Sequence, residues 1–164
     1  MPEADALLPE VYVQPGESHL VTEPAIMRTL LGSCVGITFL APRLGIGALC
    51  HAMLPCYPAK PDSDTSLAAG RRYVDFTIRD LARQFDARGA LRSEVQVKVF
   101  GGADVLMVAN EASRPTVGRL NCEAAIRVLH DEGFDVIASS LGGTSGVNIQ
   151  FHTGTGEVLL RRLD

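Results

Sequence analysis

The sequence predicts an α/β (α+β) fold: a single layered domain in which mixed β-sheets are combined with two main helices. Many short apolar segments look like strands, and two amphipathic segments with helical spacing lie far apart in the chain. Glycine- and proline-rich turns separate these segments. Many strands with two separated helices favour layers of strands and helices over an all-β sandwich. The length of 164 residues suits one ordinary domain. We expect a flexible leader over residues 1–10 and the domain over residues 11–164.

Strand-like segments dominate the first third of the chain. Apolar and β-branched residues predict strands over residues 10–13, 20–23, 26–31, 35–40 and 45–53. A short turn with Pro42 joins the last two, which predicts a hairpin. Residues 55–66 hold three prolines and several polar residues, so we expect a surface loop there. This loop is either an ordinary connection or a rim over a nearby site.

The first predicted helix covers residues 68–87. Val74, Ile78, Leu81 and Phe85 recur at helical spacing, and Gly89 supplies a stop. An alternating pattern then predicts a strand over residues 94–100.

The second predicted helix follows Pro115 and runs to about Glu132. Its apolar face is predicted to consist of Leu120, Ala124 and Val128, broadened by Cys122, Ile126 and Leu129. The remaining strands are predicted over residues 134–139, 147–151 and 157–161.

Composition excludes several classes of function. The net charge is −4 and no basic run occurs, which argues against binding to nucleic acid or to an anionic membrane surface. No apolar stretch approaches the ~20 residues that cross a bilayer, so we expect no membrane insertion. Residues 1–10 do not have the pattern of a signal peptide. We therefore expect a cytoplasmic protein with reduced cysteines at positions 34, 50, 56 and 122.

Cys34 and His51 are the candidate catalytic pair. Cys34 follows a Gly32-Ser33 step between two strand-like segments, and His51 lies near the end of the next strand. A cysteine nucleophile activated by a histidine base is a recurring arrangement in hydrolases. The small residues before Cys34 leave the N–H groups of Ser33 and Cys34 available to hold an oxyanion.

An imidazole beside the thiol is expected to stabilise a thiolate–imidazolium pair. A third group should orient the ring through its other nitrogen. Thr29, in the strand before Cys34, is one candidate, and a backbone carbonyl is the alternative.

Simpler interpretations compete with catalysis. Cys34 alone could be a small buried hydrophobe. A zinc site is disfavoured because the chain has no Cys-x-x-Cys pair and because Cys50 and His51 point to opposite sides of a strand. Cys50 is therefore expected in the core, and Asn121 is expected to bind a loop carbonyl rather than a substrate. We expect no metal and no cofactor.

Several motifs resemble the CheD family of chemoreceptor glutamine deamidases. They are Thr29-Leu-Leu-Gly-Ser-Cys-Val-Gly-Ile, Gly47-Ala-Leu-Cys-His51-Ala-Met-Leu-Pro55, Phe100-Gly-Gly-Ala103 and Val117-Gly-Arg-Leu-Asn121. The resemblance extends to the C-terminal glycine-rich segments. It implies a fold similar to the catalytic domains of deamidating toxins.

The resemblance also implies an enzyme. It would hydrolyse glutamine side chains on the cytoplasmic helices of methyl-accepting chemoreceptors, with Cys34 as nucleophile, His51 as base and Thr29 nearest to the family's supporting threonine. Two alternatives stay open. One is a chemotaxis adaptor that acts mainly by binding a CheC-type phosphatase, and the other is a cysteine hydrolase with a different amide or ester substrate. An intact pair of Cys34 and His51 favours the enzyme.

Overall fold

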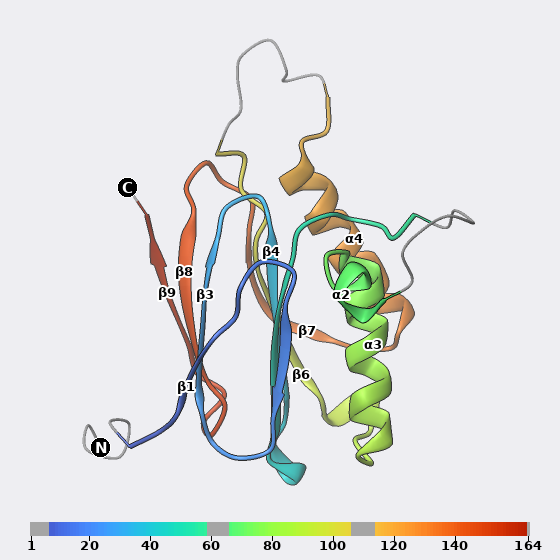
Figure 1. The fold of residues 1–164 in the computed structure, drawn as a ribbon, viewed down its shortest axis with the longest axis vertical. Helices are drawn as coiled ribbons and strands as arrows, with labels where there is room; N and C mark the ends of the chain where they lie inside the picture. Colours follow the sequence, from blue (N-terminus) through green and yellow to red (C-terminus); the bar gives the residue numbers. More distant parts are fainter. Residues whose placement is uncertain (1–6, 59–65, 106–113, 164) are drawn as a thin grey trace.

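Two β-sheets and a layer of helices lie one against another in a computed structural model of the chain (Figure 1). The structure describes residues 7–58, 66–105 and 114–163. The four-stranded sheet has the order β1 (Glu10–Tyr12), β3 (Ile26–Leu31), β8 (Val147–His152) and β9 (Val158–Arg162). The five-stranded sheet has the order β2 (Ser18–Val21), β5 (Ile46–Ala52), β4 (Val35–Ala41), β6 (Gln96–Gly101) and β7 (Val136–Leu141).

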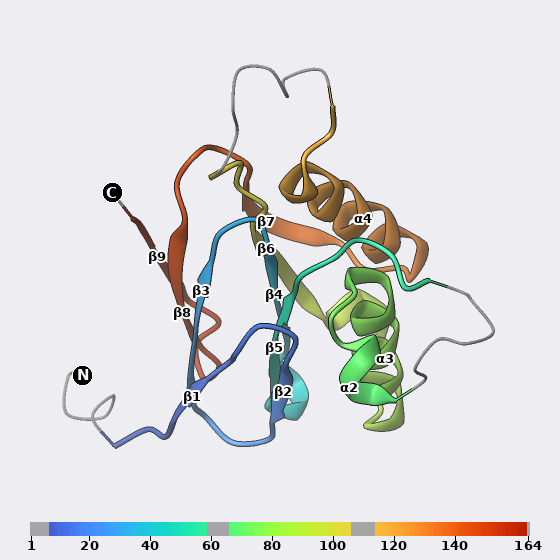
Figure 2. The same ribbon diagram turned by 45° about the horizontal axis from the view of Figure 1, so that its top comes forward.

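Helices cover one face of the five-stranded sheet, and the four-stranded sheet covers the other (Figure 2). The helices are α2 (Leu67–Gly70), α3 (Val74–Ala87) and α4 (Val117–Asp131), with short 3-10 turns η1 (Pro42–Leu44) and η2 (Arg92–Glu94). Both sheets are mixed, because β1 pairs with β3 and β6 with β7 in parallel while the other pairs are antiparallel. The predicted layered α+β architecture is thus confirmed.

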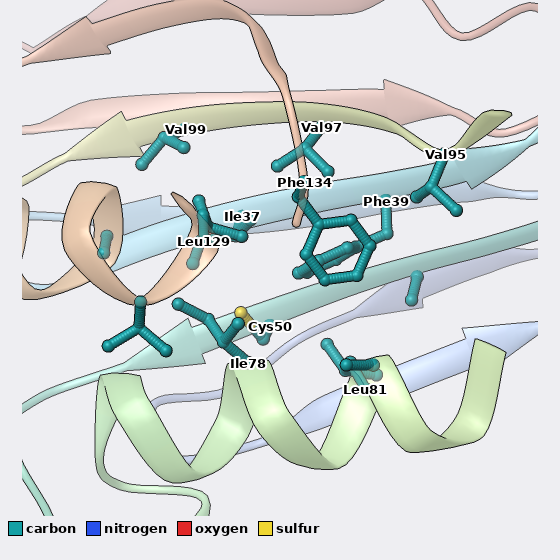
Figure 3. Close-up of a cluster of buried hydrophobic side chains, with 14 of the residues drawn as sticks. Ile37, Phe39, Cys50, Ile78, Leu81, Val95, Val97, Val99, Leu129 and Phe134 are labelled. Carbon is teal, nitrogen blue, oxygen red and sulfur yellow. The ribbon is translucent and has the colours of Figure 1, made fainter. Parts of the chain in front are cut away.

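The central sheet divides the core into two parts. Between this sheet and the helices lie Ile37, Phe39, Ile78, Leu129 and Phe134, among others (Figure 3). Between the two sheets lie Met27, Leu31, Leu49, Ile149 and Phe151, with smaller neighbours. Burying each such large side chain contributes about 1.5–3 kcal/mol. β4 is buried at every position because it has a packed layer on each side.

The predicted first helix is interrupted. Residues 68–87 were expected to be continuous, but α2 ends at Gly70 and α3 begins at Val74. The Arg72 carbonyl accepts hydrogen bonds from the N–H groups of Met53 (2.8 Å) and Leu54 (3.0 Å). The break therefore ties the segment after β5 to the helical layer. The predicted apolar face of α3 is confirmed, since Val74, Ile78, Leu81 and Phe85 are all fully buried.

The predicted apolar face of α4 was partly wrong. Ala124, Val128 and Leu129 are buried, but Leu120 and Ile126 are exposed. The polar side chain of Asn121 is fully buried on the inner face instead. α4 thus presents Asn121 rather than Leu120 to the inner face, where the Asn121 amide binds two backbone carbonyls.

The chain joins the four-stranded sheet before the end of the predicted leader. Glu10 opens β1, and the Pro9 carbonyl accepts a hydrogen bond from the Ile26 N–H (2.9 Å). Residues 1–6 of that leader lie outside the described residues.

Candidate functional site

The Gly32–Cys34 turn carries the chain from one sheet to the other. β3 ends at Leu31 in the four-stranded sheet, and β4 begins at Val35 in the five-stranded sheet. Cys34 therefore lies where the two sheets meet, and its side chain packs against the core between them. A nucleophile on such a turn is held by both sheets.

Each carbonyl in the turn accepts a hydrogen bond from another element. The Ala103 N–H donates to the Gly32 carbonyl (2.9 Å), and the Gly102 N–H donates to the Cys34 carbonyl (2.9 Å). The Asn121 side-chain amide donates to the Ser33 carbonyl (2.9 Å). Three consecutive peptide oxygens are thus held from the end of β6 and from α4.

The N–H groups of Ser33 and Cys34 have no backbone acceptor among the described residues. In a planar trans peptide the N–H points away from the C=O, so holding the carbonyls also directs these N–H groups. Unpaired backbone donors beside a nucleophile are the groups from which an oxyanion hole is built. The arrangement can therefore hold a negatively charged oxygen.

His51 lies near the end of β5, on the same side of the central sheet as Cys34. It pairs with Gly36 across β4 and β5, and Gly36 is two residues beyond Cys34. Cys34 directly precedes β4 and packs against the core between the two sheets, so the register places Cys34 diagonally from His51 on that side of the central sheet. His51 is only 3% exposed. Its backbone is held by hydrogen bonds with Gly16 and Glu17.

Thr29 holds the imidazole from the opposite sheet. Its Oγ1 lies 2.7 Å from His51 Nδ1 and 2.7 Å from the Val13 carbonyl oxygen, and Thr29 is completely buried. A hydroxyl has one hydrogen to donate, and a carbonyl can only accept it. The Thr29 hydroxyl therefore donates to Val13 and accepts from the protonated Nδ1 of His51. This assignment leaves Nε2 without a proton, as a base requires.

The local environment favours uncharged forms of both groups. Burial lowers the pKa of His51 to about 4. Burial also raises the pKa of the Cys34 thiol, although its own backbone N–H opposes the shift. Burial thus favours a neutral thiol and a neutral imidazole over the thiolate–imidazolium pair that the sequence predicts.

Cys50 and Cys122 belong to the packing of the sheet-and-helix core. Cys50 is fully buried on the helix-facing side of β5, as predicted, and burial raises its pKa to about 12 (Figure 3). Cys122, on α4, packs against the same core. Within the described ranges, no three His, Cys, Asp or Glu side chains are grouped so that they could hold a metal ion.

Sequence reasoning found some of these contacts and missed others. The expectation that Asn121 binds a loop carbonyl is confirmed. The close approach at Gly101 was missed, since a Cβ there would overlap the Cys34 carbonyl oxygen. The adjacent glycines Gly101 and Gly102 were the signal in the sequence that could have indicated this close approach. The role of the Val13 carbonyl was missed because a backbone carbonyl has no side-chain signature in the sequence.

The central part of the proposed rim, residues 59–65, lies outside the described residues.

The fold and the site define a class of protein: a layered α+β domain with a buried histidine–threonine hydrogen bond and a cysteine at the junction of its two sheets. Comparison with known proteins adds the family. The chain belongs to the CheD family, whose model, described as CheD chemotactic sensory transduction, matches residues 53–162.

Curated relatives support this assignment over nearly the whole chain. A probable chemoreceptor glutamine deamidase CheD 2 of Geobacter sulfurreducens is 44% identical, over 96% of this chain and 92% of the relative. A probable chemoreceptor glutamine deamidase CheD of Maridesulfovibrio salexigens is 32% identical, over 100% of this chain and 98% of the relative. The resemblance inferred from the sequence motifs is thus confirmed.

A solved structure shares the fold. The hypothetical protein YfiH of Bacillus licheniformis superposes with a TM-score of 0.52 at 12% identity, over 78% of this chain. This chain spans about half of that one, 51% of its length. The likeness concerns the fold alone.

In the described part of this chain, no helix combines the length and apolarity needed to cross a membrane.

Proposed function

We propose that this protein hydrolyses glutamine side chains of chemoreceptors to glutamate and ammonia. Its relatives are named chemoreceptor glutamine deamidases. The observation that carries the proposal is the hydrogen bond from His51 Nδ1 to Thr29 Oγ1, which leaves Nε2 of a buried, neutral imidazole as a base on the Cys34 side of the central sheet. Residues 11–164 act in this proposal as one catalytic domain.

The first half of the reaction forms a thioester. As Cys34 Sγ attacks the side-chain carbonyl carbon of glutamine, its proton moves to His51 Nε2, and the carbonyl electron pair moves to oxygen. The N–H groups of Ser33 and Cys34 hold that oxyanion, an interaction worth about 3–4 kcal/mol per well-placed donor. When the intermediate collapses, the C–N bond breaks. His51 Nε2 gives its proton to the departing nitrogen, which leaves as ammonia.

The second half hydrolyses the thioester. His51 Nε2 takes a proton from water as the water oxygen attacks the same carbon. A second oxyanion forms and collapses, the C–S bond breaks, and the proton returns to Cys34 Sγ. The sum is one glutamine and one water converted to one glutamate and one ammonia. Neither half requires a metal or cofactor as a reactant.

Exposed apolar side chains near the turn suit a protein substrate. Met53 and Leu54 follow His51 closely, and Leu120 is next to Asn121. Val105 lies beside Gly32, where a Cβ would be 3.8 Å from its side chain. Exposed apolar side chains that lie close together commonly contact another protein. We propose that here they contact the cytoplasmic helices of the receptor, which would place the enzyme in the cytoplasm.

Binding of a CheC-type phosphatase remains a second part of the proposal, because the family resemblance implies it. A role as an adaptor alone would not need the His51–Thr29 hydrogen bond. That bond favours the enzyme over the adaptor.

Ammonia release from a purified cytoplasmic receptor fragment tests the proposed function. We expect release with the wild-type protein, and a rate lower by about 10²-fold or more for His51→Ala, because general-base catalysis is lost. A fully active His51→Ala variant would contradict the role of His51. Absence of ammonia with the wild-type protein on receptors from its own cell would contradict the substrate.

A further inference from the structure

Asn121 is completely buried and makes two hydrogen bonds, both to backbone carbonyls. Its Nδ2 donates to the Ser33 oxygen (2.9 Å) and to the Met53 oxygen (3.0 Å). Since a carbonyl can only accept, these partners require the NH₂ end of the amide and determine its orientation. The other end, Oδ1, is buried and has no partner in the described part of the chain. A buried unpaired oxygen is costly, so the two donated bonds account for an amide at this position.

The two carbonyls come from the segments that carry the candidate nucleophile and base. Ser33 precedes Cys34, and Met53 is two residues after His51. The Gly32 and Cys34 carbonyls on either side receive backbone donors from Ala103 and Gly102. The Ser33 carbonyl receives only the Asn121 side chain among the described residues.

We propose that Asn121 is a positioning residue for acyl transfer. By holding the Ser33 carbonyl, it orients the Ser33–Cys34 peptide so that the Cys34 N–H faces the developing oxyanion. The planar trans peptide transmits the orientation, because its C=O and N–H point in opposite directions. This inference rests on the proposed thiol chemistry and adds a residue that does not itself touch the substrate.

A purely structural Asn121 would have a different signature. Loss of buried hydrogen bonds would lower stability but leave each folded molecule as active as before. A positioning residue is required only for a reaction that develops an oxyanion. Two reagents for Cys34 separate these cases.

The first reagent is p-nitrophenyl acetate. Cys34 Sγ attacks its acyl carbon, and the carbonyl oxygen becomes an oxyanion. The ester C–O bond then breaks, and p-nitrophenol leaves. The second is iodoacetamide, which Cys34 Sγ alkylates at a saturated carbon with loss of iodide and without an oxyanion. Rates of Cys34→Ala are subtracted to remove labelling of other cysteines.

The test variants are Asn121→Leu and Asn121→Asp. Both have nearly the size of asparagine, and both lack the NH₂ donor. Thr153→Val is the matched control, because Thr153 is also buried and its hydroxyl bonds the backbone of Ala25. Ala25 directly precedes the first residue of β3, whereas the Gly32–Cys34 turn follows the last one. We expect acylation to fall about 10- to 100-fold in the Asn121 variants, somewhat less than for outright loss of an oxyanion donor. Alkylation should change less than about threefold.

The remaining outcomes overturn the proposal. They are unchanged acylation, an equal fall of both rates, an equal fall of acylation in Thr153→Val, and failure of both Asn121 variants to fold. The last would give Asn121 a role in folding. If the wild-type protein reacts with p-nitrophenyl acetate but releases no ammonia from receptors, the proposed substrate fails while the test of Asn121 stands.

Discussion

Thr29 and His51 meet across the space between the two sheets, with 2.7 Å between Oγ1 and Nδ1. Thr29 belongs to β3 of the four-stranded sheet, and His51 to β5 of the five-stranded sheet. The packing of the two sheets therefore sets the orientation of the imidazole. Because the Thr29 hydrogen is donated to Val13, the bond also selects the tautomer of His51.

Replacing Thr29 by Val should slow deamidation. Val keeps the shape of the strand but removes the acceptor for His51 Nδ1–H. Loss of one neutral hydrogen bond is worth roughly 0.5–1.5 kcal/mol, which is about a three- to tenfold fall in rate. Steady-state deamidation rates at neutral pH provide the measurement.

Two further variants make the Thr29 comparison specific. Thr29→Ser retains the hydroxyl and should recover most of the rate. Thr38→Val changes another buried threonine of the inter-sheet region and should keep the wild-type rate. If Thr29→Val is as fast as the wild-type protein, Thr29 is structural and another group orients the ring.

Folding stability should decrease in acid because His51 is buried in its neutral form. The folded pKa is about 4 and the ordinary value is 6.5, so between these pH values the unfolded chain binds more protons. The free energy of unfolding therefore falls as the pH falls from 6.5 toward 4. This difference between the folded and unfolded pKa of His51 corresponds to a loss of about 2–3 kcal/mol in the free energy of unfolding between pH 7 and pH 4.5.

Urea unfolding of the wild-type protein and His51→Asn at these two pH values measures this contribution. All other titrating groups are shared, so the variant should lose less stability on acidification, by that amount. Equal losses would mean that His51 titrates normally in the folded protein.

Alkylation of Cys34 should become faster with pH well into the alkaline range. Burial raises the thiol pKa above its ordinary value, and the thiolate is the reactive form. The measurement is the rate of iodoacetamide labelling from pH 5 to pH 10, corrected with Cys34→Ala. A thiolate–imidazolium pair would instead give a plateau of high reactivity that extends down to weakly acidic pH.

Gly101→Ala should disturb the turn as well as the fold. Gly101 has a φ of 98°, and an added Cβ would overlap the Cys34 carbonyl oxygen. We expect about 1–3 kcal/mol of lost stability from the backbone strain, together with a fall in deamidation rate.

Gly89→Ala is the matched control for Gly101→Ala. Gly89 has a φ of 84°, but a Cβ there would meet no atom within 4 Å. It should lose stability and keep its activity per folded molecule. Equal activity of the two variants would show that the Gly101 contact does not position Cys34.

Local patterns in the sequence predicted the elements well. The segments around Cys34 were expected over residues 26–31 and 35–40 and occur as β3 and β4. Their assignment to different sheets could not be predicted, because both segments are mainly apolar and alternation alone does not identify a partner strand. The break between α2 and α3 was missed for a related reason. It depends on hydrogen bonds from Met53 and Leu54 to the Arg72 carbonyl, which connect distant parts of the chain.

The candidate site was predictable in part. Cys34, His51 and Thr29 carry recognisable side-chain chemistry, and Asn121 was expected to bind a loop carbonyl. The choice between Thr29 and a backbone carbonyl required the packing of the two sheets. The burial of His51, which disfavours the charged imidazolium, is not revealed by periodicity.

Mass spectrometry of a chemoreceptor co-expressed with this protein tests the central claim most directly. The measurement maps receptor glutamines that have become glutamate, with wild-type protein in one culture and Cys34→Ala in the other. Cys56→Ser serves as a control, because Cys56 is exposed and lies outside the proposed catalytic cluster. We predict conversion at specific glutamines with the wild-type protein and with Cys56→Ser, and none above background with Cys34→Ala. Equal conversion with Cys34→Ala would contradict the account.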